Sequence, residues 1–294
     1  MLLFALYGAD GVKDCVKHVA EPPDAADLTT LTHAVPEQAG DDKKMQTPYD
    51  NLSDIYDKFN NDFDYKKYLD RIFSKFDLPG SGLVLDCGCG TGSLLCELLD
   101  RGYDGTGVDG SENMLDAARE KLAAHGHTPH LVCQPLQQLD LYGAYDIVFC
   151  SLDTVNHLTS TQEVRHFFSD LYHFVEPNGW FVFDIKTRKA FESSVGARVS
   201  QQADDILIVE GAFGKRYASY QFTAFEQLPG GLYRKQEDYI EERFYESTEI
   251  KKWLLEAGFV YRGRTQLKNR ILFAAQKQGP EQVLSAADDS QNHG

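Results

Sequence analysis

Two carboxylates and a run of glycines are the residues of this chain whose types and spacing are suited to binding a ligand. Asp86 ends a short apolar segment, and glycines at 88, 90 and 92 follow it at alternate positions. Glycine permits positive φ angles and lets a ligand lie directly against the backbone. Asp109 ends a second apolar segment about 20 residues after the first glycine, where a carboxylate binds ribose hydroxyls in nucleotide-binding folds. We therefore expect a ligand that contains adenosine.

The glycine spacing argues against a dinucleotide ligand. The dinucleotide fingerprint has glycine at its first, third and sixth positions, but counting from Gly88 places Ser93 at the sixth. A carboxylate at Asp86 would also repel a pyrophosphate, which binds where a helix N-terminus offers unopposed positive charge. The same carboxylate suits a ligand that carries an ammonium and a sulfonium group.

Two segments resemble the motifs of a known family. Residues 86–92 (DCGCGTG) resemble the first motif of class I S-adenosyl-L-methionine (SAM) dependent methyltransferases, and residues 107–115 (GVDGSENML) resemble the second. The resemblance covers about residues 49–276, and it is to the small-molecule branch that includes sugar N-methyltransferases and methyltransferase domain 25. It implies an enzyme with SAM as cofactor. The cofactor-binding residues that it implies are Tyr56, Asp86, Gly88, Cys89, Gly90, Asp109, Gly110, Met114, Gln134, Leu136, Ser151 and Leu152.

Two of these assignments have particular qualifications. In the resembling enzymes, aromatic residues of the N-terminal helices close over the methionine end of SAM, which is the role open to Tyr56; packing of an amphipathic helix is the alternative. Members of the family usually carry an acid after the third strand to bind adenine, but this chain has Gln134, Pro135 and Leu136 there. Proline has neither a backbone donor nor a carboxylate. Adenine recognition must therefore rest on Gln134, Leu136 or Gln137.

The candidate catalytic residues are His157 and Asp153, in the segment after the fourth expected strand. Ligands bind beyond the carboxyl ends of strands in open α/β sheets, so this loop should face the transferred methyl group. His157 is suited to act as a base because an unperturbed histidine has a pKa of about 6.5; capping or orienting another group is the alternative. Asp153 would position an amine or cap a short helix. Asp184 is expected to be structural, and no metal site is expected.

Hydrophobic periodicity supplies the elements that would position these residues. Two amphipathic helices, within 52–59 and 65–76, precede a series of short apolar strands that alternate with helices. We predict an α/β fold, Rossmann-like, with a seven-stranded, mostly parallel sheet and helices on both faces. The expected strands are 83–86, 105–108, 130–133, 145–150, 180–185, 259–267 and 271–275.

An insertion follows the fifth expected strand. Residues 206–213, 216–227 and 232–244 alternate or run apolar, with a hairpin signal at Pro229-Gly230-Gly231, which predicts an antiparallel sheet. In the resembling methyltransferases such an insertion forms a lid over the acceptor. The expected organisation is a disordered extension over 1–46, a SAM-binding domain over 47–190 and 246–277, an inserted lid over 191–245 and a disordered tail over 278–294.

Composition restricts the partners. The net charge of −16 disfavours nucleic acid, whose binding depends on neutralising phosphates. Six cysteines in neither a disulfide framework nor zinc-site spacing are typical of a reducing cytoplasm. No secretory signal or membrane span is recognised, so neither membrane nor nucleic acid is expected as a partner. The oligomeric state is not indicated.

The expected function is transfer of a methyl group to a nitrogen or oxygen of a small-molecule acceptor. Three alternatives stay open: an RNA methyltransferase, disfavoured by charge and by the lack of an Asn-Pro-Pro-Tyr type motif, a SAM-binding regulator without catalysis, and an NAD-dependent oxidoreductase. Binding without turnover would indicate the regulator, and preference for NADH over S-adenosylhomocysteine would indicate the oxidoreductase.

Overall fold

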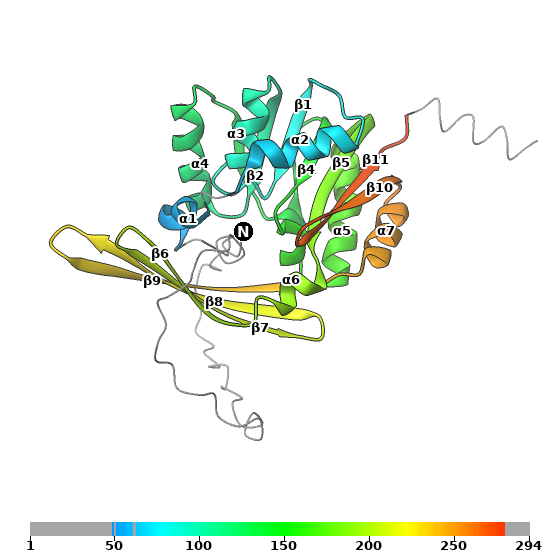
Figure 1. Cartoon of the computed structure of the whole chain (residues 1–294). Helices are drawn as coiled ribbons and strands as arrows, with labels where there is room; N and C mark the ends of the chain where they lie inside the picture. The colour runs from blue at the N-terminus through cyan, green and yellow to red at the C-terminus, as the bar shows by residue number, and fades with distance from the viewer. Residues whose placement is uncertain (1–48, 50, 61–62, 280–294) are drawn as a thin grey trace, which may run out of the picture.

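The computed structural model describes residues 49, 51–60 and 63–279, and a seven-stranded sheet forms its centre (Figure 1). The strands are β1 (Leu83–Cys87), β2 (Asp104–Asp109), β3 (His130–Cys133), β4 (Tyr145–Cys150), β5 (Val175–Lys186), β10 (Val260–Leu267) and β11 (Arg270–Gln276). Their order is β10-β11-β5-β4-β1-β2-β3. The five strands from β3 to β5 pair in parallel, whereas β11 runs antiparallel to both of its neighbours. The predicted fold class is confirmed.

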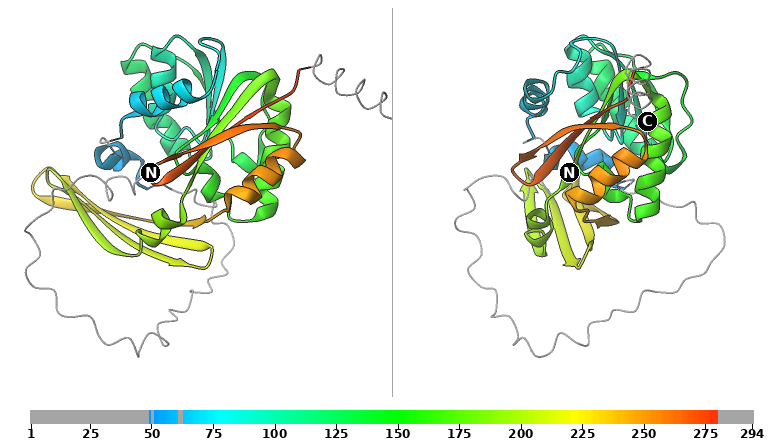
Figure 2. Two further views of the ribbon diagram at one scale, coloured as in Figure 1. Left: turned by 45° about the vertical axis from the view of Figure 1, so that its right-hand side comes forward. Right: turned by 90° about the vertical axis from the view of Figure 1, so that its right-hand side faces the viewer.

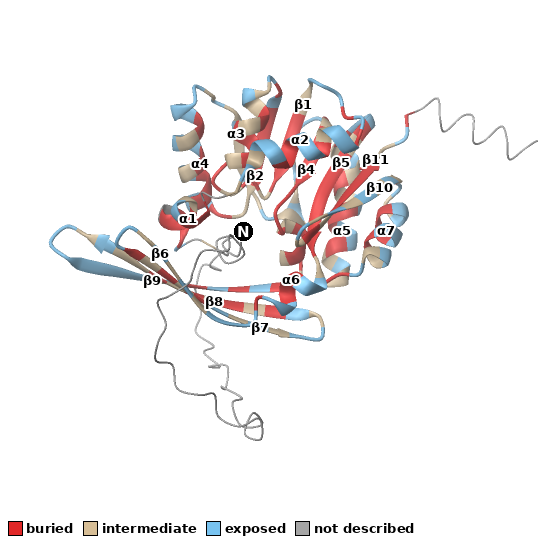
Figure 3. Ribbon diagram, viewed as in Figure 1, coloured by how far each residue is buried: buried red, intermediate tan, exposed pale blue. Residues whose placement is uncertain are grey.

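Helices cover both faces of this sheet. One face carries α2 (Tyr65–Lys75), α3 (Ser93–Asp100) and α4 (Glu112–Ala124), and the other carries α5 (Thr161–Leu171) and α7 (Ser247–Glu256). Val84 and Leu85, adjacent on β1, are both fully buried, and they belong to the cores on opposite faces. Figure 3 shows the resulting burial along the central strands. Burial on both faces explains why these strands are apolar throughout instead of alternating.

A second, four-stranded antiparallel sheet lies across one end of the main sheet (Figures 1 and 2). It consists of β6 (Gly196–Gln202), β7 (Asp205–Gly214), β8 (Tyr217–Leu228) and β9 (Leu232–Arg243), in that order, and it follows the short helix α6 (Arg188–Glu192). The last three strands match the predicted segments, but β6 was not predicted. As an edge strand, β6 has no buried row of side chains, so its sequence lacks the apolar alternation of a covered strand.

The smaller sheet has its own core. Helix α1 (Ser53–Asn60) packs Ile55 and Phe59 against it, and Phe222 of β8 is buried in the same cluster. Among the aromatic residues of the insertion, Tyr220, Phe222 and Phe244 are buried in this core. Tyr217 and Tyr239 point to solvent, with exposed fractions of 54% and 57%.

The expected extension over 1–46 lies outside the described residues, and so does the tail from 280 onward. Within the described part of the chain, none of the helices combines the length and apolar character needed to cross a membrane.

Candidate active site

A cavity of about 240 Å³, partly open to solvent, lies at the carboxyl ends of β1, β2 and β4. This is the edge of an open α/β sheet where ligands bind. Twelve of the residues singled out in the sequence line the cavity, and they come from six separate stretches of chain. They are Tyr56, Asp86, Gly88, Cys89, Gly90, Asp109, Gly110, Met114, Leu136, Ser151, Leu152 and His157.

The glycine turn after β1 is joined directly to the end of β2. The backbone N–H of Gly90 donates to Asp109 Oδ2 over 2.8 Å, and that of Gly88 donates to the Val108 carbonyl over 2.7 Å. Both glycines have positive φ, at 71° for Gly88 and 54° for Gly90. A Cβ on Gly88 would lie 2.4 Å from Thr154 Cγ2, whereas a Cβ on Gly90 would meet nothing within 4 Å. The first glycine is therefore required by packing, and the second leaves open space at the cavity wall.

Asp86 has an unusual environment for a carboxylate. Its exposed fraction is 2%, and its Oδ2 has no hydrogen-bond partner among the described residues. Burial, with a smaller contribution from the charge of Asp109, raises the pKa of Asp86 to about 7. A buried carboxylate without a partner is costly unless a cation or a donor reaches it. The cavity therefore offers a site that a positively charged ligand group would satisfy.

His157 lies at the end of the short helix η3 (Thr154–His157), in the wall of the same cavity. Its Nε2 is 3.8 Å from Glu242 Oε1 on β9, and its Nδ1 is buried without a hydrogen-bond partner in the described part of the chain. Burial lowers the pKa of His157 below its usual 6.5, against the opposing effect of Glu242. The imidazole is therefore neutral at pH 7 and keeps one ring nitrogen able to accept a proton.

Asp153 is not part of the cavity wall. It is fully buried, and its carboxylate pairs with Arg270 and, over 3.2 Å, with Lys186 Nζ. These cations hold the pKa of Asp153 below its usual range even though burial acts to raise it. The expectation that Asp153 positions an amine is corrected, because its carboxylate is already bound to two cations. Nor does its side chain cap η3, although it occupies the N-cap position.

Asp184 has the structural role that was expected. Its carboxylate accepts hydrogen bonds from the Tyr68 hydroxyl over 2.6 Å, from the Leu152 backbone over 2.9 Å and from Arg270 over 2.7 Å. It therefore ties helix α2 and the loop after β4 to β11. That loop needs this support because Leu152 and Asp153 both have positive φ, at 61° and 76°.

A buried ion pair joins the two sheets next to His157. Lys186 at the end of β5 donates to both carboxylate oxygens of Glu242 on β9, over 2.8 and 2.7 Å. The side chains are 4% and 0% exposed. Burial alone would lower the pKa of Lys186, but Asp153 and Glu242 outweigh it and the pKa lies above its usual value. Both carboxylate oxygens of Glu242, the residue beside His157, are therefore engaged by Lys186.

The turn after β3 differs from the expectation for Gln134. Its side chain bonds the backbone of Asp140 in both directions, over 3.1 and 3.0 Å, and it does not line the cavity. Gln134 therefore serves to close its own loop. Leu136 does line the cavity, together with Pro135 and Gln137.

Two tyrosines of the wall were not singled out in the sequence. Tyr49 and Tyr65 line the cavity with Tyr56. The Tyr49 ring meets those of Tyr56 and His157 edge-on, with centroids 5.6 and 5.7 Å apart. Burial raises the pKa of Tyr49 and Tyr56 well above 10, so both are neutral phenols. Their aromatic spacing was visible in the sequence, but amphipathic helices show the same pattern when it serves packing alone.

Comparisons with known proteins agree with this geometry. Residues 84–179 match the family described as "Methyltransferase domain". A putative methyltransferase of Geobacillus sp. (strain WCH70) is 27% identical over 245 residues, covering 78% of this chain and 99% of that protein. The crystal structure of a SAM-dependent methyltransferase from Clostridium acetobutylicum ATCC 824 superposes with a TM-score of 0.70 at 26% identity, covering 79% of this chain and 99% of the other. The sugar N-methyltransferase KedS8 from Streptoalloteichus sp ATCC 53650 shares the fold, with a TM-score of 0.66 at 18% identity over 82% of this chain and 98% of its own.

Proposed function

We propose that this chain, a class I SAM-dependent methyltransferase, transfers the methyl group to a nitrogen or oxygen atom of a small-molecule acceptor. One observation carries the proposal: His157 and Asp86 line one cavity, and each has a buried polar atom, Nδ1 and Oδ2, that finds no hydrogen-bond partner among the described residues. The first is suited to remove a proton from an acceptor, and the second is suited to hold a cationic donor. A protein that only binds SAM has no need of the first.

The residues of the cavity fit SAM. Asp86 would bind the ammonium of the methionine part, since its buried Oδ2 has no partner within the described part of the chain. Asp109 would bind the ribose hydroxyls, and the backbone at Gly88 and Gly90 would lie against the nucleoside. Leu136 would contact adenine, beside Pro135 and Gln137. When bound, SAM supplies an electrophilic methyl group on a sulfonium that is already a good leaving group.

The protein's own contribution is then to orient the acceptor, exclude water and take up a proton. We propose that His157 accepts the proton of an acceptor N–H or O–H at Nδ1. Its other nitrogen, Nε2, faces the Glu242 carboxylate at 3.8 Å, which stabilises the imidazolium that forms. Glu242 acts through His157 and is a positioning residue. The proton leaves His157 for solvent after the product departs.

Three features support a small acceptor. The net charge of −16 opposes binding of a polyanion. The cavity, at about 240 Å³, lies near the lower end of the roughly 300–1,000 Å³ of small-molecule sites. The smaller sheet lies behind the residues of the cavity wall. Its Glu242 is beside His157, and the ring centroids of its Phe222 and of Tyr49 are 6.1 Å apart. The sheet does not line the cavity, so its proposed role as a lid is to hold these wall residues.

We further propose that the enzyme acts in the cytoplasm. All five cysteines in the described part of the chain are free thiols, and four of them are buried. Free thiols are the usual state in a reducing compartment.

Methyl transfer from isotopically labelled SAM tests the proposal. The full chain is incubated with fractionated small-molecule extracts, and the matched control is the His157→Gln variant. Label is expected in a small-molecule fraction with the wild-type chain and should fall strongly with the variant, while both bind SAM equally in calorimetry. Binding of SAM without transfer to any fraction would instead indicate a regulator.

A further inference from the structure

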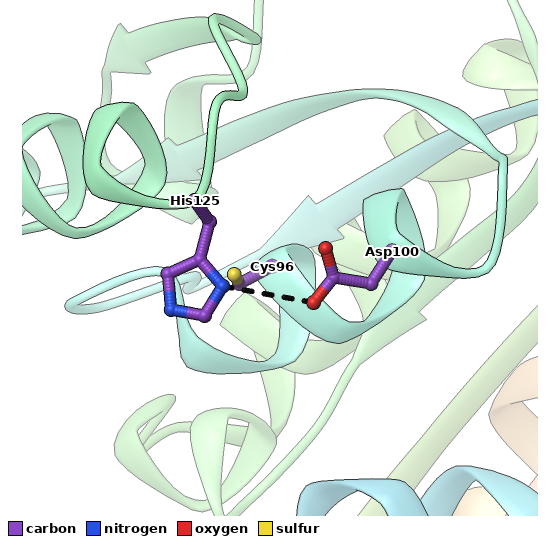
Figure 4. A group of neighbouring side chains, drawn as sticks. All are labelled: Cys96, Asp100 and His125. Atoms are coloured by element: carbon purple, nitrogen blue, oxygen red, sulfur yellow. Dashed lines mark ion pairs between the residues drawn. The ribbon is translucent and has the colours of Figure 1, made fainter.

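Three metal-binding side chains of different types meet between α3 and α4. They are Cys96 and Asp100 on α3 and His125 at the end of α4 (Figure 4). Their candidate ligand atoms all lie within 4.8 Å of one another, and His125 Nδ1 is 3.7 Å from Asp100 Oδ2. None of the three residues lines the active-site cavity. The proposed methyl transfer therefore gives no reason for this cluster.

The donor set matches the preferences of zinc. Zn²⁺ binds cysteine sulfur, histidine nitrogen and carboxylate oxygen with bond lengths of about 2.0–2.3 Å, in a tetrahedral arrangement. Tetrahedral bonds of that length place ligand atoms roughly 3.3–3.8 Å apart. The distance of 3.7 Å between His125 and Asp100 already meets this requirement. Cys96 and Asp100 are four residues apart on one helix, a spacing that puts both side chains on the same face.

The cluster borders a surface pocket, and a further hydrogen bond orients the carboxylate of Asp100. Cys96, Asp100 and His125 line one solvent-open pocket on the surface. The second carboxylate oxygen of Asp100 lies 2.7 Å from Nε2 of His127. Metal-binding carboxylates are typically held in orientation by such an outer hydrogen bond. The remaining oxygen is then directed to the other two side chains.

We propose that Cys96, Asp100 and His125 bind a Zn²⁺ ion, with water as the fourth ligand. Binding replaces the thiol proton of Cys96, which passes to solvent, by a sulfur–zinc bond. The ion links α3 to the end of α4 and so holds together two helices whose other ends border the active site. The pocket adjoins the active-site cavity, since Tyr65 and Ser93 line both.

Zinc binding is measured on the full, reduced chain by competition with a chromophoric zinc chelator. The test variants are Cys96→Ser and His125→Ala. The matched control is His166→Ala, which removes an exposed histidine that lies 3.1 Å from Asp170 on α5 but belongs to no group of potential metal ligands among the described residues. Each test variant should weaken zinc binding at least tenfold, and the control should leave it unchanged. Zinc should also raise the unfolding temperature of the wild type and of the control only.

Substitution of Co²⁺ for Zn²⁺ provides a second readout that does not depend on affinity. A sulfur-to-cobalt charge-transfer band should appear with the wild type and with His166→Ala, and should be absent with Cys96→Ser. Equal zinc affinity in Cys96→Ser and the wild type would overturn the proposal, as would an equal loss in the His166→Ala control. The three side chains would then form only a surface ion-pair cluster.

Discussion

The carboxylate of Asp86 should destabilise the free protein while favouring the bound one. Replacing it by the near-isosteric amide, Asp86→Asn, removes the charge and keeps the volume. In the free protein Oδ2 of this carboxylate is buried, and none of the described residues pairs with it. The variant should therefore be more stable than the wild type at high pH, and it should bind SAM less tightly.

The size of the first effect follows from the pKa. Folding raises the pKa of Asp86 from 3.8 to about 7, and each unit corresponds to about 1.4 kcal/mol. Because the pKa is raised, the cost to the folded state is absent below pH 3.8, grows as the pH rises and is complete above about pH 7. It then amounts to roughly 4 kcal/mol. The buried amide of asparagine offsets part of this gain by about 1–3 kcal/mol, but that offset does not vary with pH.

The assay is urea unfolding of both chains at a series of pH values. The stability difference between variant and wild type should increase by about 1.4 kcal/mol per pH unit between about pH 4.5 and 6.5, and level off above about pH 7. Asp77→Asn, at an exposed aspartate, is the control and should show no such trend. A stability difference that does not change with pH would refute the account of Asp86.

Ligand binding gives the second half of the test. SAM affinity should fall at least tenfold in Asp86→Asn, whereas the affinity for adenosine, which lacks the ammonium, should not change. Equal losses for both ligands would mean that Asp86 shapes the cavity without binding the ammonium.

Three further predictions concern the same site. His157→Gln should lower the rate of methyl transfer and leave SAM affinity unchanged; an unaltered rate would remove His157 from the mechanism. The wild-type rate should increase with pH and reach its plateau already at a pH below 6.5, because burial lowers the pKa of His157. Asp109→Ala should weaken SAM binding in calorimetry by about 1.5–3 kcal/mol, the value of a charge-assisted hydrogen bond, and an unchanged affinity would contradict the assignment. Glu242→Gln should lower the free energy of unfolding by about 3–5 kcal/mol, since it removes the nearer of the two buried carboxylates that pair with Lys186. A loss below about 1 kcal/mol would mean that Asp153 alone satisfies the lysine.

Local signals account for the parts of the site that the sequence could predict. The turn at Gly88 and Gly90 and the carboxylate of Asp109 were recognisable because each depends on residues next to it in the chain. Ser160 and Glu163 likewise have the local spacing of a capping box, and both of its hydrogen bonds are present.

The errors concern side chains whose partners become neighbours only once the chain has folded. Asp153 pairs with Arg270, 117 residues away, and nothing near Asp153 in the sequence indicates that partner. Gln134 bonds a backbone that is close in sequence, at Asp140, but only once the intervening loop has its final shape. The contact between His157 and Glu242 depends on how the inserted sheet docks, which no local pattern encodes.

The buried ion pair of Lys186 and Glu242 restricts the motions by which substrates can enter and leave the active site. Moving the smaller sheet away from the main sheet would separate two opposite charges in an apolar, buried environment. The energetic cost is too high for such a motion to occur in each catalytic turnover. Helix α1 contacts the main domain through Asp57, whose partly exposed carboxylate lies 2.7 Å from the Thr91 hydroxyl and 2.6 Å from Lys121 Nζ. Water can replace both contacts at little cost. Entry of substrate should accordingly depend on movement of helix α1, with the two sheets moving together.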